Sequence, residues 1–136
     1  MQLYSGFICA LAGALLTFAF GLWNESLTVL TVLMGVDYIT GVVASVRDGK
    51  GLSSSAGFWG LAKKGLVMLV IIIAHRIDLM MGTQVVMGAA VYFYIANELL
   101  SVIENYGRIG LPVPDKLRSI VRVLRNRADS DESDGK

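Results

Sequence analysis

An aspartate in the middle of a long apolar stretch constrains this chain more than any other feature. Residues 27–46 read LTVLTVLMGVDYITGVVASV, and Asp37 lies near their centre. About 20 apolar residues are enough to cross the hydrocarbon core of a bilayer as a helix. A central Asp costs about 2.5–3.5 kcal/mol on insertion scales, against about 0.3–0.6 kcal/mol gained for each Leu, Ile or Val. The segment therefore still inserts, and Asp37 then needs a partner or water, which marks it as a candidate functional residue.

Composition places the whole chain among membrane proteins. Hydrophobic residues make up 54% of the sequence and charged residues 17%, whereas soluble domains carry about 25% charged residues. The net charge of +1 gives no indication of a nucleic-acid partner. The single cysteine, Cys9, excludes an internal disulfide, and its place in an apolar run indicates a small hydrophobic residue. The first run has no basic flank or distinct cleavage site, so we expect it to remain in the mature protein.

Four apolar runs predict an all-α integral membrane bundle. The runs cover residues 3–23, 27–46, 65–81 and 85–103, and the segments between them are a polar turn at 24–26, a Gly- and Ser-rich loop at 47–64 and a tight turn at 82–84. Lys and Arg concentrate in the 47–64 loop and again after residue 107, so both regions are expected in the cytoplasm. Four crossings with both termini cytoplasmic satisfy this distribution. Three crossings, with the last run lying in the interface, are the alternative.

The chain changes character after residue 107, which divides it into a transmembrane helical domain at 1–107 and a cytoplasmic segment at 108–136. Proline and glycine interrupt the helix at 110–114, and an amphipathic helix is predicted for 115–127. Residues expected at the membrane surface are Lys63 and Lys64 before the third run and Lys116, Arg118, Arg122 and Arg125 in this helix. An ordinary solvated helix or a packing partner is the alternative. The acidic tail at 129–136 is expected to be disordered.

Small residues at regular spacing are candidate helix-packing positions. Gly6, Ala10 and Ala14 recur every four residues in the first run, Gly13 lies beside them, and Gly41 falls in the second run. Small side chains let helix backbones approach closely in lipid, where packing drives association. We therefore expect close helix pairing through the first run.

Polar residues inside the apolar runs are the candidate pore-lining or intramembrane polar positions: Asp37, Arg76, Asp78, Asn97, Glu98, Ser101 and Glu104. At 1.5 Å per residue, Asp37 and Arg76 each lie about 15 Å into their helices from opposite ends, near mid-bilayer. We therefore predict that these two side chains pair, within a subunit or between subunits. The alternative is that Arg76 extends to the outer headgroups.

One face of the fourth run collects several of these polar residues. Tyr94, Asn97, Ser101 and Glu104 follow a spacing of three and four residues, and Glu98 lies beside them. Such a stripe either lines water or holds a helix bundle together. The chain shows no catalytic constellation. His75 is the only histidine, which excludes a multi-histidine metal site and predicts a packed or interfacial side chain. We expect neither enzymatic activity nor a cofactor.

Several short motifs extend over most of the chain. DYITG occupies residues 37–41, a Lys pair follows at 63–64, and NELLSVIEN at 97–105 precedes GLPVP at 110–114. In order and spacing these motifs resemble the bacteriophage holin family, which also contains toxin-secretion holins. The likeness spans about residues 30–118. Its most specific part is the run at 97–105 with the Gly- and Pro-containing segment after it.

The resemblance implies a homo-oligomer in the bacterial cytoplasmic membrane that forms timed lesions. Such lesions release a phage endolysin for host cell lysis, or a toxin, without required contact between the two proteins. The lipid bilayer and a possible antiholin are the other partners that the resemblance implies. Two other functions fit the same bundle: a small ion channel or transporter subunit, and an antiholin or membrane scaffold. The size of what passes the membrane distinguishes them.

Overall fold

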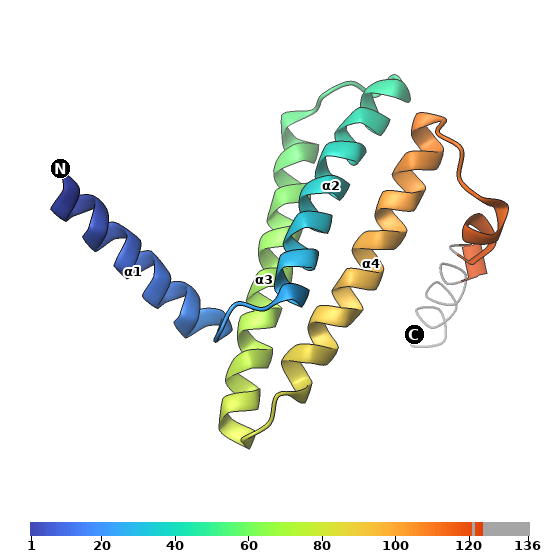
Figure 1. Cartoon of the computed structure of the whole chain (residues 1–136). Helices are drawn as coiled ribbons and strands as arrows, with labels where there is room; N and C mark the ends of the chain where they lie inside the picture. The colour runs from blue at the N-terminus through green and yellow to red at the C-terminus, as the bar shows by residue number, and fades with distance from the viewer. Residues whose placement is uncertain (121, 124–136) are drawn as a thin grey trace.

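The structure is a computed structural model that describes residues 1–120 and 122–123, and this part contains four long helices and no strand. The helices are α1 Gln2–Phe20, α2 Glu25–Arg47, α3 Ser54–Met81 and α4 Val85–Ile109 (Figure 1). They contain 19, 23, 28 and 25 residues, and each is long and apolar enough to cross a membrane. The expected all-α fold with four membrane-capable helices is therefore confirmed.

Local sequence signals set where the helices begin and end. Asn24 and Ser53 precede α2 and α3, and each side chain accepts a hydrogen bond from the backbone N–H three residues later. Gly82 and Gly110 end α3 and α4 in the left-handed conformation, with φ of 68° and 88°. Glycine adopts this conformation without steric cost, which explains its use at both helix ends.

The start of α3 differs from the sequence-based expectation. The loop predicted at 47–64 is much shorter, because α3 begins at Ser54 rather than at residue 65. Two of the glycines that suggested a loop, Gly57 and Gly60, lie inside the helix and face Tyr38 of α2. A Cβ at Gly57 would lie 3.2 Å from the Tyr38 hydroxyl oxygen, and one at Gly60 would lie 3.8 Å from its ring. These glycines therefore admit the tyrosine instead of breaking the helix.

Helices α2, α3 and α4 form the bundle. Helix α4 packs against α2 and α3, most extensively against α2. Helices α2 and α3 make few contacts with each other. Figure 1 shows the connection at 48–53 and the C-terminal end of α4 at one end of the bundle, here called the loop end. An ion pair of 2.7 Å between Arg108 and Asp48 joins these two segments. The opposite end, with the turn at 82–84, is called the turn end.

The apolar core lies in the half of the bundle nearer the turn end. Its buried residues are Phe20 from α1, Leu27, Leu30 and Met34 from α2, Ile71 from α3 and Val91 from α4. Leu27, Leu30 and Ile71 have no exposed surface. The core therefore closes the turn end of the bundle with side chains from all four helices.

The first helix extends away from the bundle. Figure 1 shows that α1 approaches the other helices at its C-terminal end, where it meets α3, and diverges toward the N-terminus. The predicted packing positions Gly6, Ala10, Gly13 and Ala14 are exposed, and no atom outside α1's own backbone lies within 4 Å of a Cβ built at Gly6 or Gly13. Within one chain this stripe makes no close helix pair. Gly41 does lie at a helix contact, where a Cβ would be 3.5 Å from the Asn105 amide nitrogen.

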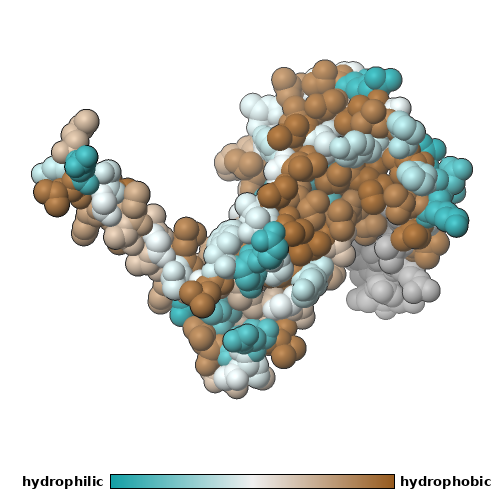
Figure 2. Space-filling model, viewed as in Figure 1, coloured by the Kyte–Doolittle hydropathy of each residue, from teal (hydrophilic) through white to brown (hydrophobic). Residues whose placement is uncertain are grey.

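The outside of the bundle is apolar. Large hydrophobic side chains are exposed on each helix, for example Ile39 on α2, Leu69 on α3 and Phe93 on α4. Figure 2 shows hydrophobic surface over much of the bundle face in view. Soluble monomers rarely expose such large contiguous apolar areas. Lipid is the environment that satisfies this surface, and the chain is a multi-pass membrane protein.

A short helical segment follows α4. Residues 115–120 are helical, and the carbonyl oxygen of Pro114 accepts hydrogen bonds from the backbone N–H groups of Leu117 and Arg118. This C-terminal helix lies beside the loop end of α4 (Figure 1). Helix α4 itself ends at Ile109, two residues beyond the predicted domain boundary. Arg125 and the acidic tail at 129–136 lie outside the described residues.

The contact of Tyr38 with α3 yields a test of the fold. Gly57→Leu places a bulky side chain against Tyr38, so we expect the free energy of unfolding in detergent micelles to fall by about 1–3 kcal/mol. Gly65→Leu is the matched control on the same helix, because a Cβ there has no neighbour within 4 Å. Equal stability of the two variants by thermal or denaturant unfolding would contradict the α2–α3 contact.

Candidate functional site

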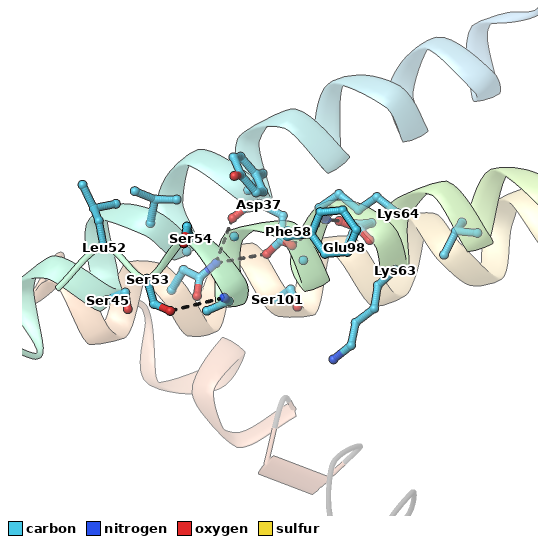
Figure 3. A pocket seen from close by; sticks show the side chains of 18 of the residues that line it. Asp37, Ser45, Leu52, Ser53, Ser54, Phe58, Lys63, Lys64, Glu98 and Ser101 are labelled. Atoms are coloured by element: carbon cyan, nitrogen blue, oxygen red, sulfur yellow. Dashed lines mark hydrogen bonds and ion pairs between the residues drawn. The ribbon is translucent and has the colours of Figure 1, made fainter. Parts of the chain in front are cut away.

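Three charged side chains from three helices meet inside the bundle. The Nζ of Lys64 on α3 lies 2.7 Å from Oδ2 of Asp37 on α2 and 2.6 Å from Oε2 of Glu98 on α4. The exposed fractions of the Lys64, Asp37 and Glu98 side chains are 15%, 18% and 7%. Figure 3 shows the Asp37, Lys64 and Glu98 side chains together in this region. We call these three residues the charged triad.

The position of the charged triad follows from the helix boundaries. Asp37, Lys64 and Glu98 each lie ten or eleven residues from the loop end of their helix. At 1.5 Å per residue this places all three side chains about 15 Å below the loop end. Because much of the bundle exterior is apolar, these three charges find their partners in one another.

The predicted pairing of Asp37 with Arg76 is wrong within the chain. Lys64 takes that place, because the early start of α3 sets it at the level of Asp37. Arg76 lies twelve residues farther along α3, and its guanidinium stacks 3.7 Å above the ring of Phe18 on α1. Its Nη2 is buried and has no hydrogen-bond partner among the described residues. Arg76 therefore links α3 to α1 through this stacking contact.

The adjacent lysines have different environments. Both Lys63 and Lys64 were expected at the membrane surface, but the side chain of Lys64 points into the bundle. Figure 3 shows the Lys63 ammonium directed away from the charged triad. A long flexible stem lets Lys64 reach Asp37 and Glu98, which sequence spacing alone does not reveal.

Asn105 extends the polar network toward the loop end, and its role was not predicted. Its Nδ2 lies 3.0 Å from Oδ1 of Asp37 and 3.1 Å from Oγ1 of Thr40, and its Oδ1 accepts a hydrogen bond of 3.3 Å from Arg108. Arg108 in turn pairs with Asp48 at the surface. A continuous polar chain therefore runs from the loop end to the charged triad.

The face of α4 that points inward differs slightly from the predicted polar stripe. The buried residues of this helix are Val91, Glu98, Val102 and Asn105. Asn97 and Ser101 lie at the edge of this face and line a cleft between the helices. Glu104 lies farther round the helix. Glu98 and Asn105 are seven residues apart, which is close to two turns. That spacing was the available signal for Asn105.

Asp78 has a structural position at the turn end. Its carboxylate accepts hydrogen bonds from the backbone N–H groups of Val86 and Met87, at 3.0 and 2.8 Å, and from the Thr83 hydroxyl at 2.6 Å. These contacts satisfy donors at the first turn of α4, as an N-cap does. His75 lies against Gly21, where α1 meets α3.

A polar cleft leads from the loop end to the charged triad. Its volume is about 790 Å³, and it is lined by residues of α2, α3, α4 and the 48–53 connection, among them Ser45, Ser53, Lys63, Asn97 and Ser101 as well as the triad (Figure 3). Below the triad the apolar core closes the bundle. The cleft therefore reaches polar groups in the middle of the bundle from one end.

The charged triad has two carboxylates and one ammonium group. An ion pair taken out of water is stable only when each charge keeps its hydrogen-bonding partners. Here Lys64 serves both acids, and Asn105 supplies a second donor to Asp37. In the described part of the chain, no group of three or more His, Cys, Asp or Glu residues is arranged to hold a metal ion. The arrangement can hold helices in register or present charge to water.

An apolar exterior on four membrane-length helices defines a multi-pass membrane bundle, here with a charged triad inside it. Similarity to known sequences specifies its family. Residues 14–126 match the sequence profile of the bacteriophage holin family. An uncharacterised protein of Listeria monocytogenes is 39% identical over 121 residues, covering 88% of this chain and 86% of the relative. A protein of Bacillus phage phi105 named as a probable holin is 38% identical over 104 residues, covering 76% of each chain. No solved structure is significantly similar. The chain belongs to the bacteriophage holin family.

Removing the shared cation tests the charged triad. Lys64→Met leaves two buried carboxylates without their common partner, so we expect the free energy of unfolding in micelles to fall by about 3–5 kcal/mol. Lys63→Met, which removes the neighbouring charge outside the triad, should have little effect.

A neutral triad gives the decisive comparison. Asp37→Asn and Glu98→Gln combined with Lys64→Met remove all three charges, so most of the lost stability should return. If Lys64→Met were as stable as the wild type in the same unfolding assay, the ion pairs would contribute nothing to the fold.

Proposed function

We propose that this protein is a holin that assembles in the bacterial cytoplasmic membrane and opens timed lesions, through which a phage endolysin or a toxin leaves the cytoplasm. Membership of the bacteriophage holin family supports this class of function. The similarity to the probable holin of Bacillus phage phi105 supports it further. The structural observation that carries the proposal is the charged triad enclosed by an apolar exterior.

The charged triad provides a physical reason for assembly. Ionisable residues at this depth are costly against lipid, so they must face protein or water. In one chain, Lys64 on α3 forms ion pairs with Asp37 on α2 and Glu98 on α4. Apart from this link, α2 and α3 make few contacts. In a large assembly, separation of α2 from α3 turns the polar cleft toward a shared aqueous lumen. Water then solvates each charge and offsets the loss of the ion pairs.

The distribution of basic residues supports an orientation. The loop end carries Arg47, Lys50 and Arg108, and the C-terminal helix adds Lys116 and Arg118. Basic residues near membrane-spanning segments favour the cytoplasmic side. We therefore assign the loop end to the cytoplasm, and four crossings place the N-terminus there as well. The endolysin then waits on the same side and needs no direct contact with the holin.

Inducible expression in bacteria tests the proposal. With a cytoplasmic muralytic enzyme present, we expect abrupt lysis after a delay, because the lesion must pass a folded protein. Without the enzyme, growth should stop and the membrane potential should collapse without lysis. Optical density, a potential-sensitive dye and release of the enzyme are the measurements.

The other outcomes point to the rival functions. Loss of membrane potential without release of the enzyme would identify an ion channel and contradict the holin proposal. Continued growth with an intact potential would identify an antiholin or scaffold and contradict it as well. Fully assembled protein in the membrane fraction must accompany either result, which detection by antibody checks.

A second test separates lesion formation from folding. Replacing Asp37, Lys64 and Glu98 together with Leu leaves no unpaired charge, so the bundle should remain folded. The lumen-facing polar surface is lost, so lysis should be absent at a protein density at which the wild type lyses cells. The control is Glu25→Gln, at the exposed first turn of α2. Normal lysis timing of the triple Leu variant would contradict the proposed role of the triad in lesion formation.

A further inference from the structure

A second groove lies between the last turns of α4 and the C-terminal helix. Its volume is about 480 Å³, and its lining residues are Ile103, Glu104, Gly107, Arg108, Val113, Arg118 and Arg122. Figure 1 shows the C-terminal helix beside the end of α4, which brings the two walls together. These residues differ from those that line the polar cleft above the charged triad. We call this second site the arginine groove.

The arginine groove is positively charged. Three guanidinium groups and the carboxylate of Glu104 line it, a formal excess of two positive charges. Arg108 is partly neutralised, because Asp48 accepts hydrogen bonds from its Nε and Nη2 at 3.1 and 2.7 Å. Arg118 and Arg122 are exposed on the C-terminal helix. The groove therefore favours an anion that reaches it from outside.

The groove also lies at the level of the lipid headgroups. Helix α4 has 25 residues, so at 1.5 Å per residue it is about 37 Å long and exceeds the roughly 30 Å hydrocarbon core. Arg108 is the penultimate residue of this helix and thus emerges from the core. Ile103 and Val113 supply an apolar wall beside the arginines. A ligand with a charged head next to apolar carbon atoms fits both surfaces.

We propose that the arginine groove binds the phosphodiester headgroup of an anionic phospholipid, with Arg118 and Arg122 as its ligating residues. A guanidinium group matches two phosphate oxygens with parallel N–H donors. Basic pockets beside the ends of membrane helices select anionic headgroups. A lipid fits better than free phosphate, because the apolar wall would otherwise face water. This proposal concerns binding and does not depend on lesion formation.

A bound lipid would act on the charged triad through existing hydrogen bonds. Arg108 lines the groove and donates from Nη1 to Oδ1 of Asn105 at 3.3 Å. Asn105 donates to Oδ1 of Asp37 at 3.0 Å, and Asp37 bonds Lys64. A headgroup that holds the C-terminal helix against α4 therefore fixes Arg108, the residue at the loop end of this chain of hydrogen bonds. Lipid composition thereby acts on the stability of the bundle.

Native mass spectrometry of the full chain in a neutral detergent tests the proposal. We expect discrete adducts of phosphatidylglycerol at concentrations that give none with phosphatidylcholine. Substituting Arg118→Gln and Arg122→Gln should weaken phosphatidylglycerol binding by about five-fold for each charge removed. Inorganic phosphate serves as a separate arm. Binding of phosphate as tight as that of the lipid would overturn the assignment to a membrane lipid.

Two variants distinguish a defined groove from general attraction. Lys116→Gln removes a charge from the same helix but lies outside the groove lining, so it should leave adduct formation nearly unchanged. Arg122→Lys keeps the charge and loses the paired donors, so it should weaken binding. The proposed groove would be contradicted if Lys116→Gln weakened phosphatidylglycerol binding as much as the Arg→Gln variants did and Arg122→Lys had no effect on it. Circular dichroism verifies that each variant keeps its helix content.

Discussion

One ammonium group held between two carboxylates organises the interior of this bundle. Lys64 joins Asp37 and Glu98, so three helices meet around charges instead of around another apolar layer. Each charge keeps its partner only while the helices stay in register, which disfavours alternative packings of the same apolar faces. Asn105 strengthens this constraint by holding Asp37 from the side of α4. Apolar packing at the turn end then completes a structure whose two halves differ in chemistry.

This difference gives the bundle a direction. Toward the turn end, Leu27, Leu30 and Ile71 are fully buried and exclude water. Toward the loop end, a polar cleft reaches the charged triad, and a chain of hydrogen bonds links the triad to Arg108 and the surface. The lipid binding proposed for the C-terminal helix would therefore act at one end of a hydrogen-bond chain that leads to the buried charges. The turn end has no comparable polar connection among the described residues.

Much of the fold was predictable from the sequence, and the site was predictable in part. Hydrophobic runs broken by polar turns located four helices, because length and apolar composition dominate insertion. The start of α3 was missed, since Gly57 and Gly60 indicate a loop until Tyr38 is seen to pack against them. Asp37 was recognised from its depth in an apolar run, and Glu98 from its place beside the polar stripe of the fourth run. Their partner was not, because the direction of a long Lys side chain depends on how the helices pack.

The separation of α1 from the charged triad has a consequence for chain length. This helix contributes Phe20 to the core and a stacking ring to Arg76, but no lining residue to the polar cleft. In the proposed four-crossing topology, a product starting near Asn24 would retain the ion pairs among the described residues but would cross the membrane an odd number of times. Its two extremities would then be pulled to opposite faces of the bilayer. In the proposed four-crossing topology, the N-terminal helix therefore keeps both ends of the chain on one side of the bilayer, besides its contacts with the core and with Arg76.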